Sequence, residues 1–180
     1  ACTWPSLDPA RLENADLRRL NLGPLLDLYE PGSTIKPLFI SWALQTRAIA
    51  MDTWWDCGGS DGIHHFGPRK VQEYHVNPNP LTTENVLIKS SNVGAVRIVH
   101  ERLGFPGIYA ALEAFGVAGR IPAGYPMIAR SRYTPRRDAK RFWTDVSMAQ
   151  GYEIMLSPLA LARIYLTIAR EPAHDFSGTL

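Results

Sequence analysis

Tyr29-Glu30-Pro31-Gly32-Ser33-Thr34-Ile35-Lys36-Pro37 is the stretch that decides the fold, because an irregular segment becomes a long apolar helix there. From Ser33 onward, apolar residues recur at steps of three and four, which is the period of a helix with one buried face. Pro37 falls within the first helical turn, where its missing N–H is tolerated. The pattern predicts a helix over about Ser33 to Ala50, with Ser33 and Lys36 on the same face.

A serine three residues before a lysine at a helix start is a candidate nucleophile with its base. The Ser33 hydroxyl is a weak nucleophile until a base takes its proton. Lys36 can act as that base only if burial or nearby positive charge lowers its pKa. The helix N-terminus also directs backbone N–H groups at an oxyanion beside Ser33. On spacing alone, the pair more often marks a first-turn serine followed by a solvated lysine.

A second polar pair, Ser90 and Asn92, lies at a predicted break between two helices. Thr82 and Thr83 are candidate N-caps for the first helix, and Gly104 is expected to close the second. At such a break a hydroxyl can relay a proton and an amide can bind a substrate carbonyl. The same residues also fit simple helix caps.

The rest of the chain is expected to be mainly helical. A loop is predicted over 52–80, with a short hairpin around Gly67, and a further helix over Phe105 to Phe115. Strand signals are limited to the first few residues and to Arg69–Tyr74. An arginine-rich loop is predicted over 130–141.

The last predicted helix begins at Pro158, with Ser157 as its N-cap. Its apolar spacing suggests one buried side. The residues that we expect on that side are Leu159, Ala162, Tyr165, Leu166 and Ala169.

Composition indicates one soluble globular domain. The 180 residues are 46% hydrophobic and 20% charged, with a net charge of +2, which excludes disordered and low-complexity classes. No apolar run approaches the roughly 20 residues that cross a bilayer. The chain begins with Ala1 inside an expected strand, so we expect a fragment of a longer protein.

Two other clusters are interpreted as incidental. Cys57, His64, His65 and His75 carry zinc-type ligands, but their spacing fits no standard site, so we expect no metal. The basic and aromatic residues of the 130–141 loop could line a nucleic-acid groove. The balanced overall charge favours a solvated loop, so we expect no nucleic-acid partner.

Three blocks occur in an order that resembles the transpeptidase domain of class B penicillin-binding proteins. They are 29–37, Lys89-Ser90-Ser91-Asn92-Val93-Gly94, and Gly151 to Ala162, and the opening Trp4-Pro5-Ser6-Leu7-Asp8-Pro9 is similar as well. The resemblance implies the mixed α/β fold of penicillin-binding proteins and serine β-lactamases. Residues 1–180 would hold only part of that domain, mostly its helices, without its N-terminal and C-terminal strands.

The resemblance implies a peptidoglycan D,D-transpeptidase, an acyl-transfer enzyme that needs no cofactor. Ser33 would attack the stem peptide, Lys36 would activate Ser33, Ser90 would pass a proton to the leaving amine, and Asn92 would bind the peptide backbone. Stem peptides would be substrates and β-lactams inhibitors. A membrane glycan polymerase would be the partner, and the domain would lie on the extracytoplasmic face of a bacterial membrane, with its anchor outside this chain.

The chain departs from the family in lacking a Lys-Thr-Gly or Lys-Ser-Gly strand. None of its four lysines is followed by such a pair, and Ser177-Gly178-Thr179 has Phe176 where the lysine belongs. Truncation explains this most simply, and we expect the 180 residues alone to be a poor transpeptidase. A non-catalytic domain that binds peptidoglycan or a partner, and a serine β-lactamase or D,D-carboxypeptidase, remain as alternatives.

Overall fold

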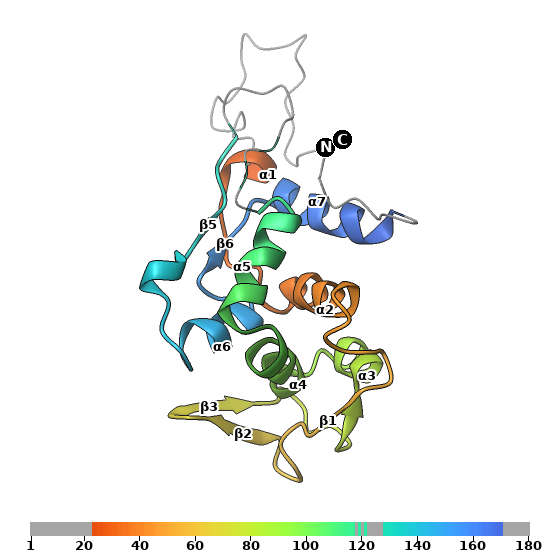
Figure 1. Cartoon of the computed structure of the whole chain (residues 1–180). Coiled ribbons are helices and arrows are strands. Elements are labelled where there is room, and N and C mark those ends of the chain that lie inside the picture. The colour runs from red at the N-terminus through yellow and green to blue at the C-terminus, as the bar shows by residue number, and fades with distance from the viewer. Residues whose placement is uncertain (1–22, 118, 120, 122–127, 171–180) are drawn as a thin grey trace, which may run out of the picture.

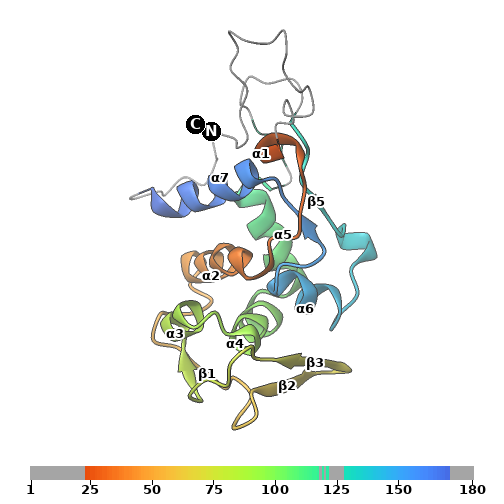
Figure 2. The same cartoon turned by 180° about the vertical axis from the view of Figure 1, so that it is seen from behind.

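The computed structural model describes residues 23–117, 119, 121 and 128–170. This part of the chain is mainly helical, with short strand pairs at its edges (Figure 1; Figure 2). The strand expected at the start of the chain, Cys2 and Ser177-Gly178-Thr179 lie outside the described residues.

Helix α2 (Lys36–Gln45) lies in the middle of the molecule, between α7 on one side and α3 and α4 on the other (Figure 1). One 3-10 turn, η3 (Gly32–Ile35), leads into it. The predicted helix start is therefore confirmed. The predicted end at Ala50 is wrong, because the chain turns out of the helix at Arg47, whose φ is 56°.

The helix break expected near Ser90 and Ser91 is confirmed. Four helical segments run in order along this part of the chain: α3 (Thr83–Ile88), α4 (Asn92–Arg97), the π-helical η4 (Ile98–Leu103) and α5 (Gly104–Ala114). The Thr82 side chain accepts a hydrogen bond from the Asn85 N–H and caps α3. Gly104 ends η4 with a φ of 56°, where a side chain would be strained.

The core forms where α2, α4, η4 and α5 pack together with α6 (Thr144–Ala149). Apolar side chains from these elements are fully buried and supply most of the hydrophobic stabilisation. They include Leu38, Phe39, Ile40, Val93, Val96, Ile98, Ile108, Leu112, Val146 and Met148.

The strands of the described residues form three antiparallel pairs. These are β1 (Trp54–Trp55) with β4 (Leu81–Thr82), β2 (Ile63–Phe66) with β3 (Arg69–Gln72), and β5 (Arg132–Tyr133) with β6 (Ile154–Met155). The hairpin expected around Gly67 is confirmed. The segment 130–141 is not all loop, because it contains β5 and the 3-10 turn η5 (Arg136–Asp138).

Helix α7 (Pro158–Ala169) begins as predicted, with the Ser157 hydroxyl accepting from the Ala160 N–H, and packs on α2 and α1 (Gly23–Leu26). Its predicted buried side is wrong: Ala160 and Ile164 are buried, whereas Ala162, Tyr165, Leu166 and Ala169 are exposed. The helix is apolar nearly all round, so its periodicity could not select a face. Within the described ranges, no helix is long and apolar enough to cross a membrane.

Candidate active site

Lys36 is the buried centre of the site. It is the first residue of α2 and is only 2% exposed. Its ammonium nitrogen donates to the Ser90 carbonyl at 2.5 Å, to the Ser90 hydroxyl at 3.2 Å and to Asn92 Oδ1 at 2.8 Å. The structure thus brings three of the four predicted site residues together from two distant parts of the chain.

The electrostatics around Lys36 favour a base. Burial disfavours the charged amine and lowers the pKa of Lys36 from 10.5 to about 8, although the Glu73 carboxylate partly opposes the shift. A lysine with this pKa is partly neutral near physiological pH. The neutral amine is the form that can accept a proton.

Ser33 lies at the surface beside this centre. It is exposed on the η3 turn and lines a cavity of about 570 Å³ together with Ser90 and Asn92. No hydrogen bond joins the Ser33 hydroxyl to Lys36, because all three ammonium protons point to other acceptors. Loss of one proton frees a lone pair on the Lys36 nitrogen, which can then accept from a nearby hydroxyl.

The turn that carries Ser33 is held from several sides. The Thr34 hydroxyl donates to the Pro31 carbonyl, and the Tyr165 hydroxyl of α7 donates to the Thr34 carbonyl. The Gly32 N–H donates to the Gly151 carbonyl at 3.2 Å. A Cβ on Gly151 would overlap the backbone of Gly32, so only glycine fits this close approach. The block that begins at Gly151 therefore packs directly on Gly32, the residue before the candidate nucleophile.

The turn between α3 and α4 presents Ser90 and Asn92 to the cavity. Ser90 has a φ of 52°, in the left-handed region that few residues other than glycine adopt. Its neighbour Ser91 is buried and accepts from the Gly94 N–H as the N-cap of α4. Asn92 uses Oδ1 to accept from Lys36 and Nδ2 to donate to the Gln72 carbonyl at 3.0 Å. These contacts orient the Asn92 amide. Ser91 caps α4 while Ser90 and Asn92 line the cavity, so this turn is both a helix cap and part of the candidate site.

Glu73 belongs to the site and was missed in the sequence. It is 7% exposed, and its carboxylate accepts from the Ser91 hydroxyl at 2.5 Å and from the N–H groups of Asn92 at 2.9 Å and Val93 at 3.0 Å. It thereby fixes the start of α4, where negative charge is favourable. A usable signal was its place two residues after Val71 in the segment Arg69–Tyr74, where the expected strand would put both side chains on one face.

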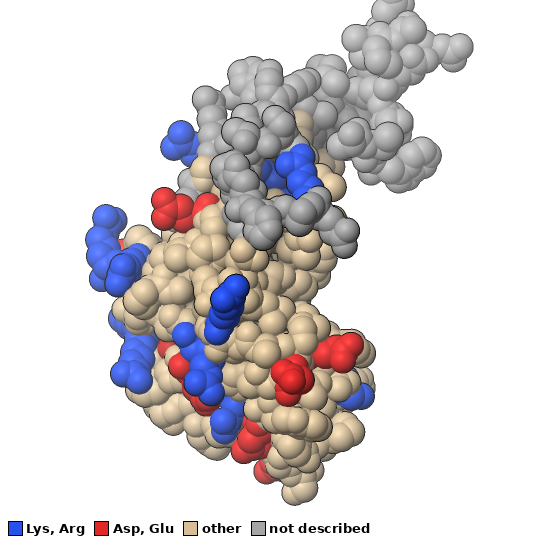
Figure 3. Space-filling model, turned by 45° about the vertical axis from the view of Figure 1, so that its right-hand side comes forward, with Lys and Arg blue, Asp and Glu red and all other residues tan. Residues whose placement is uncertain are grey.

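The two clusters interpreted as incidental are the Cys57 and histidine set and the basic and aromatic segment that starts at Arg130. Among the described residues, no three His, Cys, Asp or Glu side chains are grouped to hold a metal ion. His64 lies against Arg97, and Cys57 is buried. In Figure 3, Lys and Arg gather along the left edge of the face, but Asp and Glu lie among and beside them. This surface carries both signs of charge.

Comparison with known sequences identifies one family. The family model "Penicillin binding protein transpeptidase domain" matches residues 5–173. "Probable peptidoglycan D,D-transpeptidase PenA" of Neisseria gonorrhoeae is 30% identical in an alignment of 177 positions that covers 93% of this chain and 28% of that protein. "Peptidoglycan D,D-transpeptidase FtsI" of Escherichia coli K12 is 28% identical over 91% of this chain. The chain spans about a quarter of the length of these curated relatives.

Solved structures share the fold. The transpeptidase domain of penicillin-binding protein 3 from Burkholderia pseudomallei covers 81% of this chain with a TM-score of 0.74 and 28% identity, and 43% of that structure is matched. A peptidoglycan glycosyltransferase from Burkholderia ambifaria covers 82% of this chain with the same TM-score and 27% identity, and 45% of it is matched. The expected fold class, mixed α/β and present only in part, is confirmed.

Proposed function

The chain belongs to the transpeptidase domain family of penicillin-binding proteins, and from this premise we propose that the protein carrying it is a peptidoglycan D,D-transpeptidase. The observation that carries the proposal is the buried Lys36 amine, which contacts Ser90 and Asn92 beside a cavity that Ser33 lines. The names of the relatives point to the same reaction.

In the proposed reaction, neutral Lys36 accepts the proton of the Ser33 hydroxyl. The Ser33 oxygen attacks the carbonyl carbon between the two terminal D-alanines of a stem peptide, and the C–N bond breaks. Ser90, in contact with Lys36, passes the proton to the departing amine of D-alanine. An amine of a second stem then attacks the ester, its C–O bond breaks, and Ser33 regains a proton.

Asn92 and Ser33 are proposed to position the substrate. The Asn92 amide is held by Lys36 and Gln72 and lines the cavity, where it can hydrogen-bond the peptide backbone. The Ser33 N–H, at the start of the helical turn, would be one donor to the oxyanion. We also propose the extracytoplasmic face of the membrane as the location, β-lactams as inhibitors, and a glycan polymerase as the partner.

Glu73 makes a hydrolytic enzyme the weaker alternative. A β-lactamase or carboxypeptidase needs a group that activates water against the acyl-enzyme. Glu73 is the carboxylate among the described residues that line the cavity, and three donors from the start of α4 already occupy it. It is held as a structural acceptor and is poorly placed to act as a free base.

Labelling of the intact protein with a fluorescent penicillin tests the proposed function. We expect one label per chain, on Ser33, stable for many minutes, and none on a Ser33→Ala variant. Transfer of a stem peptide to an amine acceptor should then be detectable by mass spectrometry. Rapid turnover of the penicillin would point to a β-lactamase, and absence of any label would favour the non-catalytic alternative.

The rate of this labelling should depend on pH through Lys36. Below its pKa of about 8 the amine is protonated and cannot accept the Ser33 proton. The second-order acylation rate should therefore rise about tenfold per pH unit up to about pH 8 and then level off. Rates measured from pH 6 to 10 check this. If the acylation rate keeps rising until the pH approaches 10.5, the ordinary pKa of lysine, then burial does not lower the pKa of Lys36.

A further inference from the structure

A second cavity lies beside the candidate active site. Its volume is about 480 Å³, and it is lined by Thr134, Asp138, Lys140, Trp143, Thr144 and Glu153. Tyr152 lines the first cavity and Glu153 lines the second, so the two cavities flank adjacent residues of one segment. None of the steps proposed above uses a residue of the second cavity.

The backbone is strained at Glu153, which lines this cavity, and at Phe142, the residue before Trp143. Phe142 and Glu153 have φ values of 66° and 58°, and they are two of the four residues other than glycine with positive φ in the described ranges. Such strain persists only where surrounding contacts enforce it. The Phe142 ring packs against His100, with ring centres 5.1 Å apart, and a Cβ on Gly67 would touch it. This anchoring fixes the position of the next residue, Trp143.

Trp143 presents an aromatic surface to the cavity. It is 47% exposed, and the Arg69 guanidinium lies over its ring at 4.9 Å. The ring is thus supported by the protein and still open to a ligand. Such a ring offers an apolar face and a polar donor together.

The polar groups of the cavity are only partly engaged. Within the described part of the chain, the Lys140 ammonium has no ion-pair partner. Among the described residues, Glu153 uses Oε2 to accept from the Thr134 hydroxyl at 2.8 Å and leaves Oε1 open, and Asp138 has only a long surface pair, 3.7 Å, with Arg137. Two carboxylates disfavour phosphate and other anions. Mixed donors and acceptors around an aromatic ring match a neutral polyhydroxyl ligand.

We infer that this cavity binds a neutral saccharide, with one sugar ring stacked on Trp143 and its hydroxyls bonded to Glu153, Asp138 and Lys140. This identification rests on the proposed function: the saccharide is a segment of the glycan strand whose stem peptide enters the active site. A five-residue stem reaches at most about 17 Å, and adjacent Cα atoms are about 3.8 Å apart. A glycan held on one side of Tyr152 and Glu153 can therefore deliver its peptide to the other side.

Binding of a fluorescent β-1,4-linked tetrasaccharide of N-acetylglucosamine, which has no stem peptide, tests the inference. Fluorescence anisotropy on the intact protein should show saturable binding. Trp143→Ala should weaken it at least about tenfold, as loss of a central aromatic anchor does. Trp143→Phe, which keeps a ring, should restore most of the affinity. Thermal melting checks that each variant is folded.

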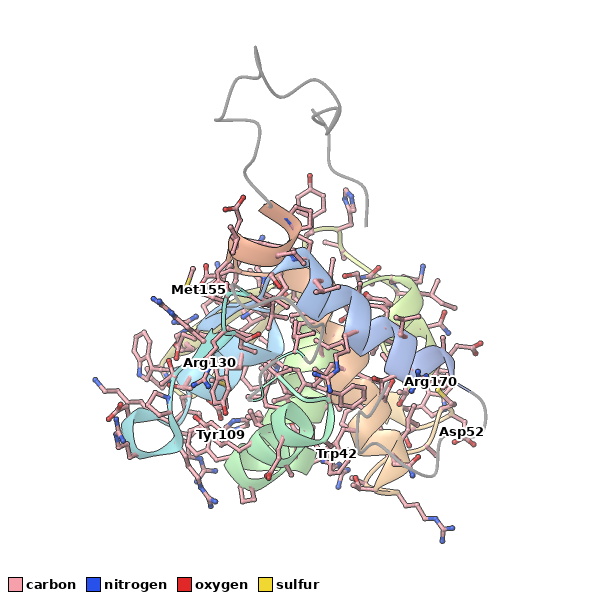
Figure 4. All side chains as sticks on the ribbon, turned by 90° about the horizontal axis from the view of Figure 1, so that it is seen from above. Trp42, Asp52, Tyr109, Arg130, Met155 and Arg170 are labelled. Atoms are coloured by element: carbon pink, nitrogen blue, oxygen red, sulfur yellow. The ribbon has the colours of Figure 1, made fainter. Side chains whose placement is uncertain are left out.

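Trp54 is the matched control, because it is 65% exposed and lines neither cavity. Asp52, two residues before it, lies on the opposite side of the molecule from Arg130, which precedes β5, and from Met155, the last residue of β6 (Figure 4). Trp54→Ala should leave tetrasaccharide binding unchanged. Ser33→Ala should leave it unchanged as well, and Trp143→Ala should still be labelled by penicillin at the normal rate.

The outcomes separate the two proposals. Absence of tetrasaccharide binding, or equal binding by Trp143→Ala, would overturn the saccharide site whatever the penicillin result. Competition by a sugar-free stem peptide would also overturn it, because the ligand would then be peptide. Loss of penicillin labelling with intact, Trp143-dependent sugar binding would leave the site standing and refute only the transpeptidase.

Discussion

Replacing Lys36 with methionine should lower the rate of penicillin acylation about a thousandfold, within the range that a general base contributes. Methionine has a similar length and no charge, so it fits the buried position without leaving an unpaired cation. It cannot accept the Ser33 proton, and it no longer orients Ser90 and Asn92, which Lys36 contacts at 2.5 and 2.8 Å. Stopped-flow or gel-based labelling of the intact protein measures the rate.

Two further variants make the Lys36 result specific. Lys36→Arg keeps the charge but should not restore activity, because the guanidinium stays protonated and is too broad for this buried position. Lys70→Met, on the exposed side of the β2–β3 hairpin, should retain the normal rate. A Lys36→Met protein that folds and is acylated normally would assign the base elsewhere.

Replacing Glu73 with glutamine should destabilise the protein, because the Glu73 carboxylate anchors the start of α4. The amide keeps one acceptor oxygen and turns an NH₂ group toward donors that the carboxylate now satisfies at 2.5 to 3.0 Å. Each buried donor left without a partner costs about 1–3 kcal/mol, so we expect the free energy of unfolding to fall by about 2–4 kcal/mol. Urea denaturation measures the loss.

Glu73→Gln should also change the pH profile, which a purely structural role would not do. The Glu73 charge raises the pKa of Lys36 against the effect of burial. In the uncharged variant the pKa of Lys36 should fall below about 8, so the acylation rate should reach its plateau at a lower pH. Glu113→Gln, exposed on α5, is the control and should alter neither quantity. If the variant loses stability but the pH dependence of its acylation rate is unchanged, Glu73 serves only to anchor the helix.

Most helix boundaries could be predicted from the sequence because local signals set them. Ser157 and Thr82 cap the helices that they were expected to cap, and Gly104 ends η4. Where local signals were missing, prediction was wrong. Nothing in the sequence around Arg47 marks the left-handed turn that ends α2, and the short strands β5 and β6 exist only because they pair with each other across 20 residues.

Some features of the candidate site could likewise be predicted from the sequence, and others could be seen only in the structure. By itself the sequence determined the candidate nucleophile, its lysine and the Ser90–Asn92 turn, because each depends on neighbours three or four residues away in a helix or at its end. Only the tertiary structure decided that Lys36 is buried and that its pKa is lowered. It also decided that Glu73 anchors α4 and that Trp143 and Glu153 line one cavity. The physical reason is that burial, charge pairing and cavities arise between segments far apart in the chain, and no local pattern encodes their distance.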